Sequence, residues 1–420
     1  MTHTDNSTDA FEPRSAIART LVERGYVNQV TDLEGVDHAF ATGIVPVYAG
    51  FDATADSLHV GHLMPIMALR RLQQAGHKPI VLIGGGTTRI GDPSFRSAAR
   101  PMLSEDEIAA NVSGIRTVFE RLLTFGDGAS DAVMVNNADW LDRMAWIDML
   151  RDVGKHFSVN RMLSFDSVKS RLEQQENLSF LEFNYMILQA VDFLELFRRT
   201  GCRLQLGGGD QWGNIVGGVD LLRRIEGAEV FGMTTPLLTT ASGVKMGKTA
   251  AGAVWVNADR LSPYDYWQFW RNVEDADVVR FLKLFTDLPL DEIERLGRAE
   301  GADLNAVKER LANEATALVH GSHAAERAQQ TAREAFGQGE AAAGLPTVEL
   351  NGAERAAGVA LVDLLVRAGL AASKSEARRA IAGRGVRIDG EVVEDADGLV
   401  TIGGQPLRLS LGRKRHVVVK

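Results

Sequence analysis

Apolar residues recur in two alternating patterns along the first 250 positions. Short uninterrupted apolar runs, such as KPIVLIGGG from residue 78, are typical of strands buried on both faces of a parallel sheet. Between the runs lie amphipathic stretches, and the stretch over residues 61–74, which ends before an Ala-Gly pair, predicts a helix. A strand, a helix and a second parallel strand imply a right-handed crossover. The pattern therefore predicts an α/β fold with a doubly wound parallel sheet.

The rest of the chain has other patterns. Apolar residues recur at helical spacing over residues 263–336, which predicts an all-helical region. The next residues are small and poor in large apolar groups, which is typical of a linker. Further on, Ser373 and Glu376 predict a capping box at a helix start, and VRIDGEVV predicts two strands joined by an Asp-Gly turn. We expect an α/β domain with an N-terminal arm, a helical domain, a linker and a small α+β module, at residues 1–262, 263–336, 337–352 and 353–420.

Composition narrows the class of protein. With 420 residues, 45% of them hydrophobic and 24% charged, the chain is expected to be globular with more than one core. The first residues lack the pattern of a signal peptide, and no segment has the ~20 apolar residues of a membrane helix, so we expect a cytoplasmic protein with no membrane partner. The single cysteine, Cys202, excludes an intrachain disulfide and a multi-cysteine zinc site.

Charge is distributed unevenly. The whole chain carries a net charge of −9, but its last sixty residues hold eleven basic and seven acidic side chains. Binding to an RNA backbone requires such clustered cations, so we expect this region to bind RNA. The alternative is a basic surface that only aids solubility. The candidate RNA-binding residues are Lys374, Arg378, Arg379, Arg384, Arg413, Lys414 and Arg415.

Two histidines, His59 and His62, flank Gly61 where the first amphipathic stretch begins. This position follows a predicted strand, where open α/β sheets bind ligands. A metal site would need a third ligand, and although Asp52 and Asp56 are near in sequence, no HExxH spacing is present. One histidine could instead cap the helix while the other packs. We favour an anion site, because a helix N-terminus and imidazole N–H groups attract phosphate and Gly61 permits close approach.

Two glycine-rich loops differ from known nucleotide-binding loops. GGGTTRIG has Arg89 where the dinucleotide fingerprint needs its third glycine, and GVKMGKT is one residue too short for a P-loop. The second loop still carries Lys245, Lys248 and Thr249. These side chains suit transient contact with phosphate, although a solvated surface turn explains them equally well.

A third feature violates the binary pattern. The stretch SFLEFNYMILQAVDFLELF is strongly apolar and helical, yet Tyr185, Gln189 and Asp192 fall on one face. Buried polar groups are costly unless paired, so either another segment or a small polar ligand must meet them. Nearby, QLGGGDQWGN places Asp210 and Gln211 after three glycines, in a loop suited to close ligand approach.

Four motifs together point to one family. YAGFDATADSLHVGH and KMGKT resemble the HIGH region and KMSKS loop of class I aminoacyl-tRNA synthetases, and NYMILQAVDF with GGGDQWGN is similar to the bacterial tyrosyl-tRNA synthetases. The resemblance extends from about residue 39 to 420. It implies a Rossmann-like catalytic domain, a helical domain and an RNA-binding module of the ribosomal small-subunit protein type, in a homodimer. It also implies that L-tyrosine is activated with ATP and Mg²⁺ and transferred to the 3′ end of tRNA(Tyr), with no tightly bound protein-ligated metal.

The same resemblance implies roles for individual residues. In the tyrosine site, it assigns the phenol hydroxyl to Tyr48 and Asp192, the ammonium group to Asp92, Tyr185 and Gln189, and the carboxylate to Gln211. For ATP binding and catalysis, it assigns two further sets of residues. Asp52, Thr54, His59, His62 and Asp210 bind ATP, with Asp210 at the ribose. The departing pyrophosphate is bound by Lys245, Lys248, Thr249, Arg96 and Arg100. Asn137 and Trp140 match an asparagine and a tryptophan with a less direct supporting role.

The sequence departs from the family pattern at a few positions. Ala53 replaces a common proline, Gly209 replaces a serine, and Thr88 and Arg89 stand where glycine and leucine are frequent. Arg96 replaces a lysine and retains its charge. None of these departures removes a group that the chemistry requires.

Two other classes of protein stay open at this point. A tryptophanyl-tRNA synthetase would share the fold and both signature motifs, but an indole offers no hydroxyl for Tyr48 and Asp192 to bind. A non-enzymatic RNA-binding derivative would keep the folds and lose the phosphate-binding residues, whereas His59, His62 and Lys248 are all present.

Overall fold

The computed structural model describes residues 12–94, 102–243, 246–249, 252–336, 345–402, 406–412 and 415–420. The chain divides into two compact units. The first comprises Met1–Met246 and Glu274–Ala299, and the second comprises Gly247–Val273 and Glu300–Lys420. No helix in the described ranges is long and apolar enough to cross a lipid bilayer.

The first unit is built on a six-stranded sheet with the strand order β1-β6-β5-β2-β3-β4. Neighbouring strands are parallel except at the edge, where β1 is antiparallel to β6. The strand order reverses between β2 and β5, which makes their carboxyl ends the expected ligand-binding position. The strands are β1 (Gln29–Val30), β2 (Pro46–Phe51), β3 (Lys78–Ile83), β4 (Val133–Asn136), β5 (Leu204–Gly208) and β6 (Phe231–Thr235).

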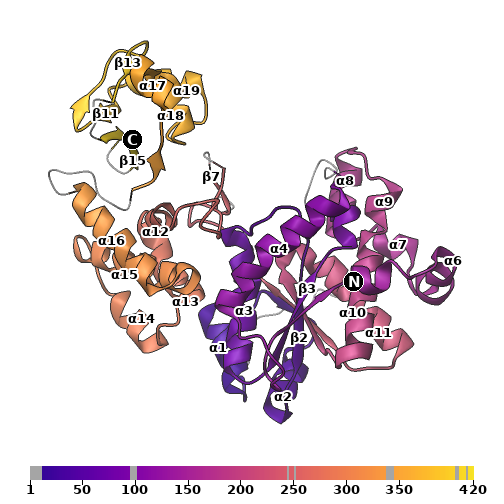
Figure 1. Cartoon of the computed structure of the whole chain (residues 1–420). Coiled ribbons are helices and arrows are strands. Elements are labelled where there is room, and N and C mark those ends of the chain that lie inside the picture. Colours follow the sequence, from indigo (N-terminus) through magenta and orange to yellow (C-terminus); the bar gives the residue numbers. More distant parts are fainter. Residues whose placement is uncertain are drawn as a thin grey trace. The chain divides into compact units, whose positions relative to one another are not determined.

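Helices cover both faces of this sheet, with α3 and α4 on one side and α10 and α11 on the other (Figure 1). Polar caps define several starts; for example, Ser104 and Glu107 form a reciprocal capping box at α4. The helices are α1 (Ala16–Arg24), α2 (Leu33–Thr42), α3 (Leu63–Gln74), α4 (Glu105–Leu122), α5 (Ala138–Leu141), α6 (Trp146–Asp148), α7 (Val159–Met162), α8 (Asp166–Glu173), α9 (Phe180–Phe183), α10 (Tyr185–Thr200), α11 (Trp212–Ile225), α13 (Val278–Phe285) and α14 (Leu290–Leu296).

The helix α13 is fastened to this unit by buried cations. Arg24 of α1 donates to the carbonyls of Lys283 and Leu288 at 2.8 and 2.6 Å. Arg71 of α3 pairs with Asp287 at 2.6 Å and also donates to a backbone carbonyl just after α13. Cations at a helix C-terminus satisfy its last carbonyls and oppose its dipole. The sequence alone placed α13 with the helical region, whereas these contacts tie it to α1 and α3.

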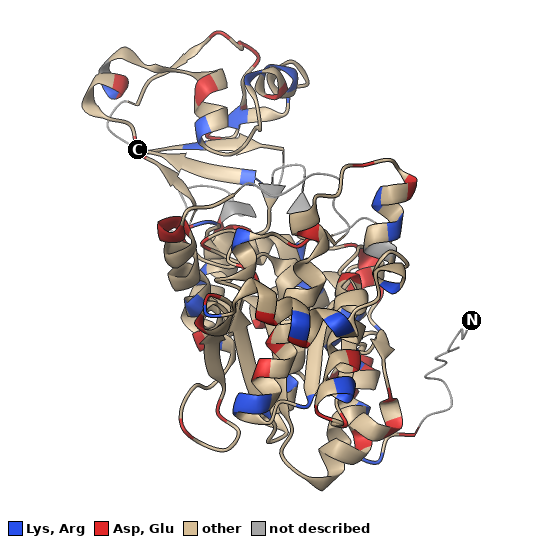
Figure 2. Ribbon diagram, turned by 90° about the vertical axis from the view of Figure 1, so that its right-hand side faces the viewer, with Lys and Arg blue, Asp and Glu red and all other residues tan. Residues whose placement is uncertain are grey.

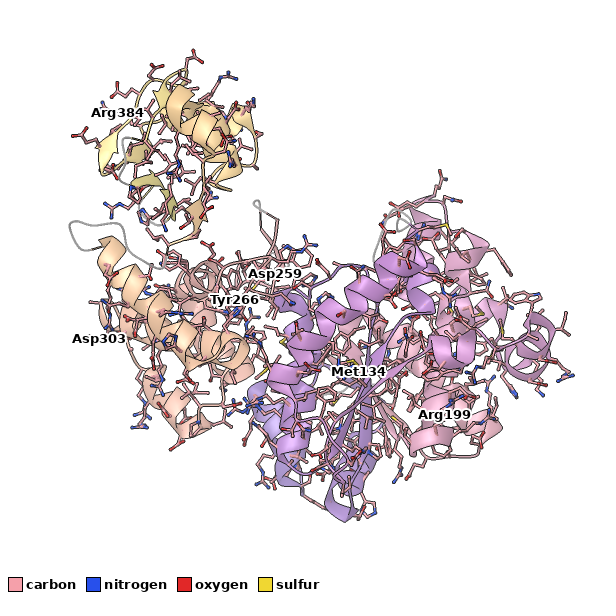
Figure 3. All side chains as sticks on the ribbon, viewed as in Figure 1. Met134, Arg199, Asp259, Tyr266, Asp303 and Arg384 are labelled. Atoms are coloured by element: carbon pink, nitrogen blue, oxygen red, sulfur yellow. The ribbon has the colours of Figure 1, made fainter. Side chains whose placement is uncertain are left out.

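The second unit begins with a short hairpin and a group of helices. The hairpin strands are β7 (Lys248–Thr249) and β8 (Gly252–Ala253), and the helices are α12 (Pro263–Arg271), α15 (Asp303–His320) and α16 (Ser322–Phe336). Ser262 caps α12, and a proline occupies the first turn. Tyr266, labelled in Figure 3, lies fully buried with its ring 5.0 Å from that of His320.

The C-terminal module of this unit has a five-stranded sheet in the order β12-β11-β14-β15-β9 and a separate β10-β13 pair. Its apolar core includes Leu364, Ile381 and Leu409. The elements are β9 (Thr347–Val348), α17 (Gly352–Ala357), β10 (Val359–Ala360), α18 (Leu361–Arg367), α19 (Lys374–Ala382), β11 (Val386–Ile388), β12 (Glu391–Val392), β13 (Leu399–Val400), β14 (Leu407–Leu411) and β15 (Arg415–Val419).

Most local expectations agree with these elements. The doubly wound parallel sheet, the strand at residue 78 and the helix ending at Gln74 are confirmed, although the first helical turn, Val60–His62, is a 3₁₀ turn. The strands around the Asp-Gly turn are β11 and β12. Ser373 caps α19 by accepting from the Glu376 amide at 3.2 Å, but the Glu376 carboxylate accepts from Ala372 rather than completing a capping box. The domain boundaries stay predictions.

Candidate active site

Polar side chains gather where β2, β3 and β5 end. Tyr48 lies within β2 and Asp52 directly after it, while Asp210 follows β5. The helix α10 supplies Tyr185, Gln189 and Asp192 from one face. The chain therefore brings residues separated by more than 150 positions to the strand ends where the sheet order reverses.

Asp192 is a buried carboxylate held at both oxygens. Trp140 donates its indole N–H to Oδ1 at 2.8 Å, and Asn137 donates an amide hydrogen to Oδ2 at 2.9 Å. Burial raises the pKa of Asp192 to about 7, against the opposing effect of these two hydrogen bonds. Arg199, labelled in Figure 3, lies over the Trp140 ring at 5.2 Å. Asn137 and Trp140 thus act directly on Asp192, which is closer support than the sequence indicated.

Tyr48 offers a hydroxyl to the same pocket. Its side chain is only 1% exposed, and its hydroxyl has no hydrogen-bond partner among the described residues. Burial, followed by the nearby charge of Asp192, raises the pKa of Tyr48 well above its usual value. A buried polar atom without a partner is costly, so this hydroxyl indicates a place where a ligand donates or accepts a hydrogen bond.

A chain of hydrogen bonds joins the two ends of the α10 face. Asn137 donates to Thr87 Oγ1 at 3.0 Å, and Thr87 donates to Asp52 Oδ1 at 2.8 Å. The hydroxyl of Tyr185 donates to the other oxygen of Asp52 at 3.0 Å. Burial, and then the charges of Asp52 and Asp92, raise the pKa of Tyr185 well above normal. Asp52, expected to bind ATP, here fixes the orientation of a predicted tyrosine-binding residue.

A second chain links the remaining predicted tyrosine-binding residues. Gln211 donates through Nε2 to Asp92 Oδ2 at 2.7 Å, and the other oxygen of Asp92 accepts from the Ser94 amide at 2.9 Å. Asn214 donates to Gln189 Oε1 at 3.1 Å and to Gln211 Oε1 at 3.2 Å. The structure thus brings Asp92, Gln189 and Gln211 together through a residue that the sequence analysis missed.

The close packing between the end of β5 and the start of α11 depends on glycine. A Cβ atom at Gly207 would lie 3.1 Å from the Cβ of Gln211 and 3.1 Å from Ile215 Cδ1. A larger residue there would displace the start of α11. Asp210 is partly buried in the same loop. Gly209, where the family has serine, lies beside Asn28, whose Nδ2 would be 3.1 Å from an added Cβ.

His59 and His62 cap the 3₁₀ turn Val60–His62 that leads into α3. His59 Nδ1 accepts from the Gly61 amide at 3.1 Å, and His62 Nδ1 accepts from the His59 amide at 3.2 Å. The two rings stack with centroids 3.9 Å apart. A neutral imidazole whose Nδ1 accepts carries its hydrogen on Nε2. Capping sets each Nε2 as a donor, which is compatible with anion binding, and the anion site stays a prediction.

Several predicted phosphate-binding groups cannot be placed. Arg96, Arg100 and Lys245 lie outside the described residues, and so do the side chains of Lys248 and Thr249. Thr54 is exposed, and its amide donates to the Asp52 carbonyl at 2.9 Å. Within the part of the chain that the structure covers, no cluster of three or more His, Cys, Asp or Glu side chains could hold a metal.

Two departures from the family pattern are coupled. Ala53, unlike proline, has a backbone N–H, and it donates to Thr88 Oγ1 at 2.8 Å. Both residues are buried, at 0% and 3% exposure. Thr88 therefore supplies the acceptor that the extra N–H requires. Arg89, a third departure, is not part of this pair: its guanidinium forms an ion pair with Asp142 at the surface.

The candidate RNA-binding residues differ in how they are paired. Arg378 and Arg379 are exposed on α19. Lys374 pairs with Asp363 at 2.6 Å, and Arg384, labelled in Figure 3, pairs with Glu394 at 2.9 Å. Acidic and basic residues alternate along the ribbon of this module (Figure 2). Arg415 donates to the Gly369 carbonyl, whereas Arg413 and Lys414 lie outside the described residues.

Sequence reasoning missed Thr87 and Asn214. Thr87 is 2% exposed and Asn214 is 4% exposed, and both are polar groups within hydrogen-bonded chains. Asn214 lies three positions after Gln211 at a helix start, a spacing that places two side chains side by side. That spacing could have identified Asn214 from the sequence as a neighbour of Gln211.

The fold is that of a doubly wound α/β protein with a small C-terminal α+β module, and comparison with known proteins identifies the family. Residues 42–337 match the model of class I tRNA synthetases (W and Y), and residues 361–405 match the S4 domain. Tyrosine–tRNA ligases from Cereibacter sphaeroides and Zymomonas mobilis are 58% and 60% identical, over 98% and 97% of this chain and 99% and 98% of their own.

Solved structures agree with these relatives. C-terminally truncated mitochondrial tyrosyl-tRNA synthetases of Coccidioides posadasii and Aspergillus nidulans match with TM-scores of 0.66 and 0.70 at 34% and 30% identity. The matches cover 75% and 76% of this chain and 91% and 94% of those chains. The chain belongs to the class I tRNA synthetases, and within them to the tyrosine–tRNA ligase family.

Proposed function

We infer that this protein is a tyrosine–tRNA ligase, which activates L-tyrosine with ATP and transfers the tyrosyl group to the 3′ end of tRNA(Tyr). One observation supports the choice of amino acid above all others. The buried hydroxyl of Tyr48 and the buried carboxylate of Asp192 are polar groups in an otherwise apolar core cluster. A phenol hydroxyl donates to a carboxylate and accepts from a tyrosine, whereas phenylalanine and tryptophan leave the Tyr48 hydroxyl unpaired and give Asp192 no further donor.

We propose that the opposite end of the substrate meets Asp92, Gln189, Tyr185 and Gln211. Asp92 accepts hydrogen bonds from Ser94 and Gln211, which fix the orientation of its carboxylate. An ionised carboxylate beside the Gln189 carbonyl suits an ammonium group. Gln211 is placed to reach the substrate carboxylate, with its orientation fixed by its neighbours.

The chemistry needs positioned charge rather than a general base. The tyrosine carboxylate is already ionised and attacks the α-phosphorus of ATP in line, which gives tyrosyl adenylate and pyrophosphate. His59 and His62 present Nε2–H donors toward the phosphates, and Thr54 adds a hydroxyl. Asp52 and Asp210 bind other parts of ATP, Asp210 at the ribose. We propose that the departing pyrophosphate is stabilised by Lys245, Lys248, Thr249, Arg96 and Arg100.

Transfer is the second step. A ribose hydroxyl at the 3′ end of tRNA attacks the activated carbonyl and displaces AMP. The basic S4 module holds the RNA backbone through its exposed cations. We propose that Mg²⁺ arrives bound to ATP, because the phosphates are its preferred oxygen ligands. The reaction belongs in the cytoplasm, where tRNA is charged for translation.

We also propose that the chain acts as a homodimer. Large apolar side chains are exposed on the segment between β4 and α10, and the Trp146 and Phe180 rings lie 6.3 Å apart in an edge-to-face contact. Exposed apolar patches of this kind mark protein interfaces. The exposed members include Trp146, Ile147, Leu150, Val159, Phe180 and Leu181. Sedimentation equilibrium should give twice the chain mass, and Phe180→Glu should shift it toward one chain mass.

Amino-acid-dependent exchange of pyrophosphate into ATP tests the activity. With all twenty amino acids tried, only tyrosine should support rapid exchange, and tRNA(Tyr) should then be charged. Exchange with tryptophan would favour the alternative synthetase, and no exchange with any amino acid would favour a non-enzymatic RNA-binding protein. In Tyr48→Phe and Asp192→Asn variants, discrimination against phenylalanine should fall, because the first removes the hydroxyl and the second the charge that favour a phenol.

A further inference from the structure

We propose that Asn214 is a positioning residue that fixes the amide orientation of Gln189 and Gln211 and thereby prepares the site for the substrate ammonium group. This inference rests on the proposed function. Asn214 lies in the first turn of α11 and is 4% exposed. Its role is assigned from the direction of its hydrogen bonds.

The single amide nitrogen of Asn214 serves two glutamines. It donates to Gln189 Oε1 at 3.1 Å and to Gln211 Oε1 at 3.2 Å. An asparagine amide nitrogen has two hydrogens and accepts none, so both glutamine groups facing it must be carbonyl oxygens. The otherwise reversible amide of each glutamine is thereby set in one orientation.

The orientation of Gln211 determines how it contacts Asp92. With its carbonyl held by Asn214, Gln211 can only present N–H groups on its other side, and it donates one to Asp92 Oδ2 at 2.7 Å. The chain of donors runs in one direction, from Asn214 through Gln211 to Asp92. It ends on a carboxylate that also accepts from the Ser94 amide at 2.9 Å. Ser94 and Gln211 thus hold both oxygens of Asp92, which fixes the direction in which its carboxylate faces a cation.

The orientation of Gln189 matters in a different way. A carbonyl oxygen has two lone pairs, and the bond from Asn214 uses one of them. The other is available to accept from an ammonium group. If the amide reversed, Gln189 would present N–H groups to that cation and repel it. Asn214 is therefore expected to act on the ammonium end of the substrate, which it does not itself touch.

Two analogues separate this role from general damage to the pocket. Tyramine keeps the ammonium group and lacks the carboxylate, whereas 3-(4-hydroxyphenyl)propionate keeps the carboxylate and lacks the ammonium group. Asn214→Leu keeps a branched side chain of similar shape, although a larger one, and removes both donors. We expect the KM for tyrosine and the inhibition constant of tyramine to rise about tenfold or more. The inhibition constant of hydroxyphenylpropionate should rise less, because that analogue depends only on the Gln211 donor and not on Gln189 or Asp92, and the KM for ATP should stay within about twofold.

A matched control exists elsewhere in the chain. Asn272 also donates its amide to a glutamine oxygen, Gln268 Oε1, at 3.2 Å, but in the second unit. Asn272→Leu should leave all four constants unchanged. Asn214→Ala, which cannot overpack the site, replaces the leucine variant if thermal denaturation shows that Asn214→Leu does not fold.

The outcomes distinguish failure of the positioning role from failure of the proposed function. Unchanged tyrosine KM in a folded Asn214 variant overturns the positioning role. Equal losses for tyramine and hydroxyphenylpropionate, with a lowered melting temperature, assign Asn214 to general packing. If the wild-type protein itself shows no tyrosine-dependent exchange, the proposed function fails instead.

Discussion

Trp140 donates its indole N–H to Asp192 Oδ1 at 2.8 Å, in a pocket where Asp192 is 2% exposed. The indole thus fixes the carboxylate that is proposed to accept the phenol hydroxyl. Because Asn137 holds the other oxygen, the carboxylate plane cannot rotate without breaking a hydrogen bond. Its remaining lone pairs therefore keep one direction.

Removing the indole donor should loosen this arrangement. Trp140→Phe keeps a ring beneath Arg199 and removes only the N–H. The KM for tyrosine in pyrophosphate exchange should rise about tenfold, because a charged hydrogen bond is lost. Trp267→Phe, which removes an indole donor to Asn313 Oδ1 in the second unit, is the control and should keep the wild-type KM for tyrosine. A Trp140→Phe enzyme with unchanged tyrosine KM would show that Asn137 alone positions Asp192.

The pKa of Asp192, raised by burial to about 7, makes stability depend on pH. The unfolded chain releases this proton near pH 3.9, whereas the folded protein keeps it to about pH 7. Ionisation in the fold is therefore unfavourable, and the free energy of unfolding should fall as the pH rises through this window. Asp192→Asn should remove that part of the slope. Denaturant unfolding of the wild type and Asp192→Asn between pH 5 and 8 measures this slope. Parallel curves for the two proteins would show that Asp192 is not its source.

Tyrosine binding should show the opposite dependence on pH. The ionised form of Asp192 is the better acceptor for a phenol hydroxyl, so tyrosine affinity should increase as the pH rises through about 7. Equilibrium dialysis with tyrosine alone measures this effect without the catalytic step. Asp192→Asn should bind tyrosine weakly at every pH, and a pH dependence preserved in that variant would assign it to another group.

Ala53 and Thr88 should behave as a coupled pair. Ala53→Pro leaves the Thr88 hydroxyl without its donor, and Thr88→Gly leaves the Ala53 N–H without an acceptor. Each change should lower the free energy of unfolding by roughly 1–2 kcal/mol. The double variant restores the common family pattern and should lose less than the sum of the two. Strictly additive losses in urea denaturation would show that the two departures are independent.

The attachment of α13 should depend on Asp287. Burial alone raises the pKa of Asp287, but hydrogen bonding to Arg70 and the charge of Arg71 outweigh it and lower that pKa. Asp287→Ala leaves the buried Arg71 without a carboxylate and should destabilise the protein by roughly 2 kcal/mol, given the partial exposure of Asp287. The difference should be full above pH 3.8, the ordinary pKa of the group, and should shrink as the pH falls through the lowered pKa of the folded protein. Thermal unfolding of both proteins at a series of pH values from 7 downward makes the comparison.

The C-terminal cations should differ in their effect on RNA. Arg378→Gln and Arg379→Gln should weaken tRNA binding and reduce the slope of log K against log salt by about 1 each. Lys374→Gln should have a smaller effect, because Lys374 already pairs with Asp363. Tyrosine-dependent pyrophosphate exchange should not change in any of them. Equal effects at all three positions in filter binding would mean that intramolecular pairing does not select the RNA contacts.

The sequence predicted the features that depend on the periodicity of apolar and polar residues. Alternation of apolar runs and amphipathic stretches indicated the parallel sheet, and the polar positions of α10 were identified because they interrupt an apolar helix. It did not predict which polar groups meet, since Thr87 and Asp52 are 35 positions apart and their 2.8 Å contact depends on the packing of two strands. The attachment of α13 was missed for a related reason: Arg24 and Arg71 look like surface residues until their carbonyl partners are in place.

The histidine pair at the start of α3 links ligand binding to local folding. Each imidazole holds a backbone amide through Nδ1, so a phosphate that draws on the Nε2 hydrogen also makes Nδ1 a stronger acceptor. Nucleotide binding should then slow hydrogen exchange at the His59 and Gly61 amides. The first turn of this helix thus serves as a reporter: its amide protection follows occupancy of the phosphate site, even for a nucleotide analogue that cannot react.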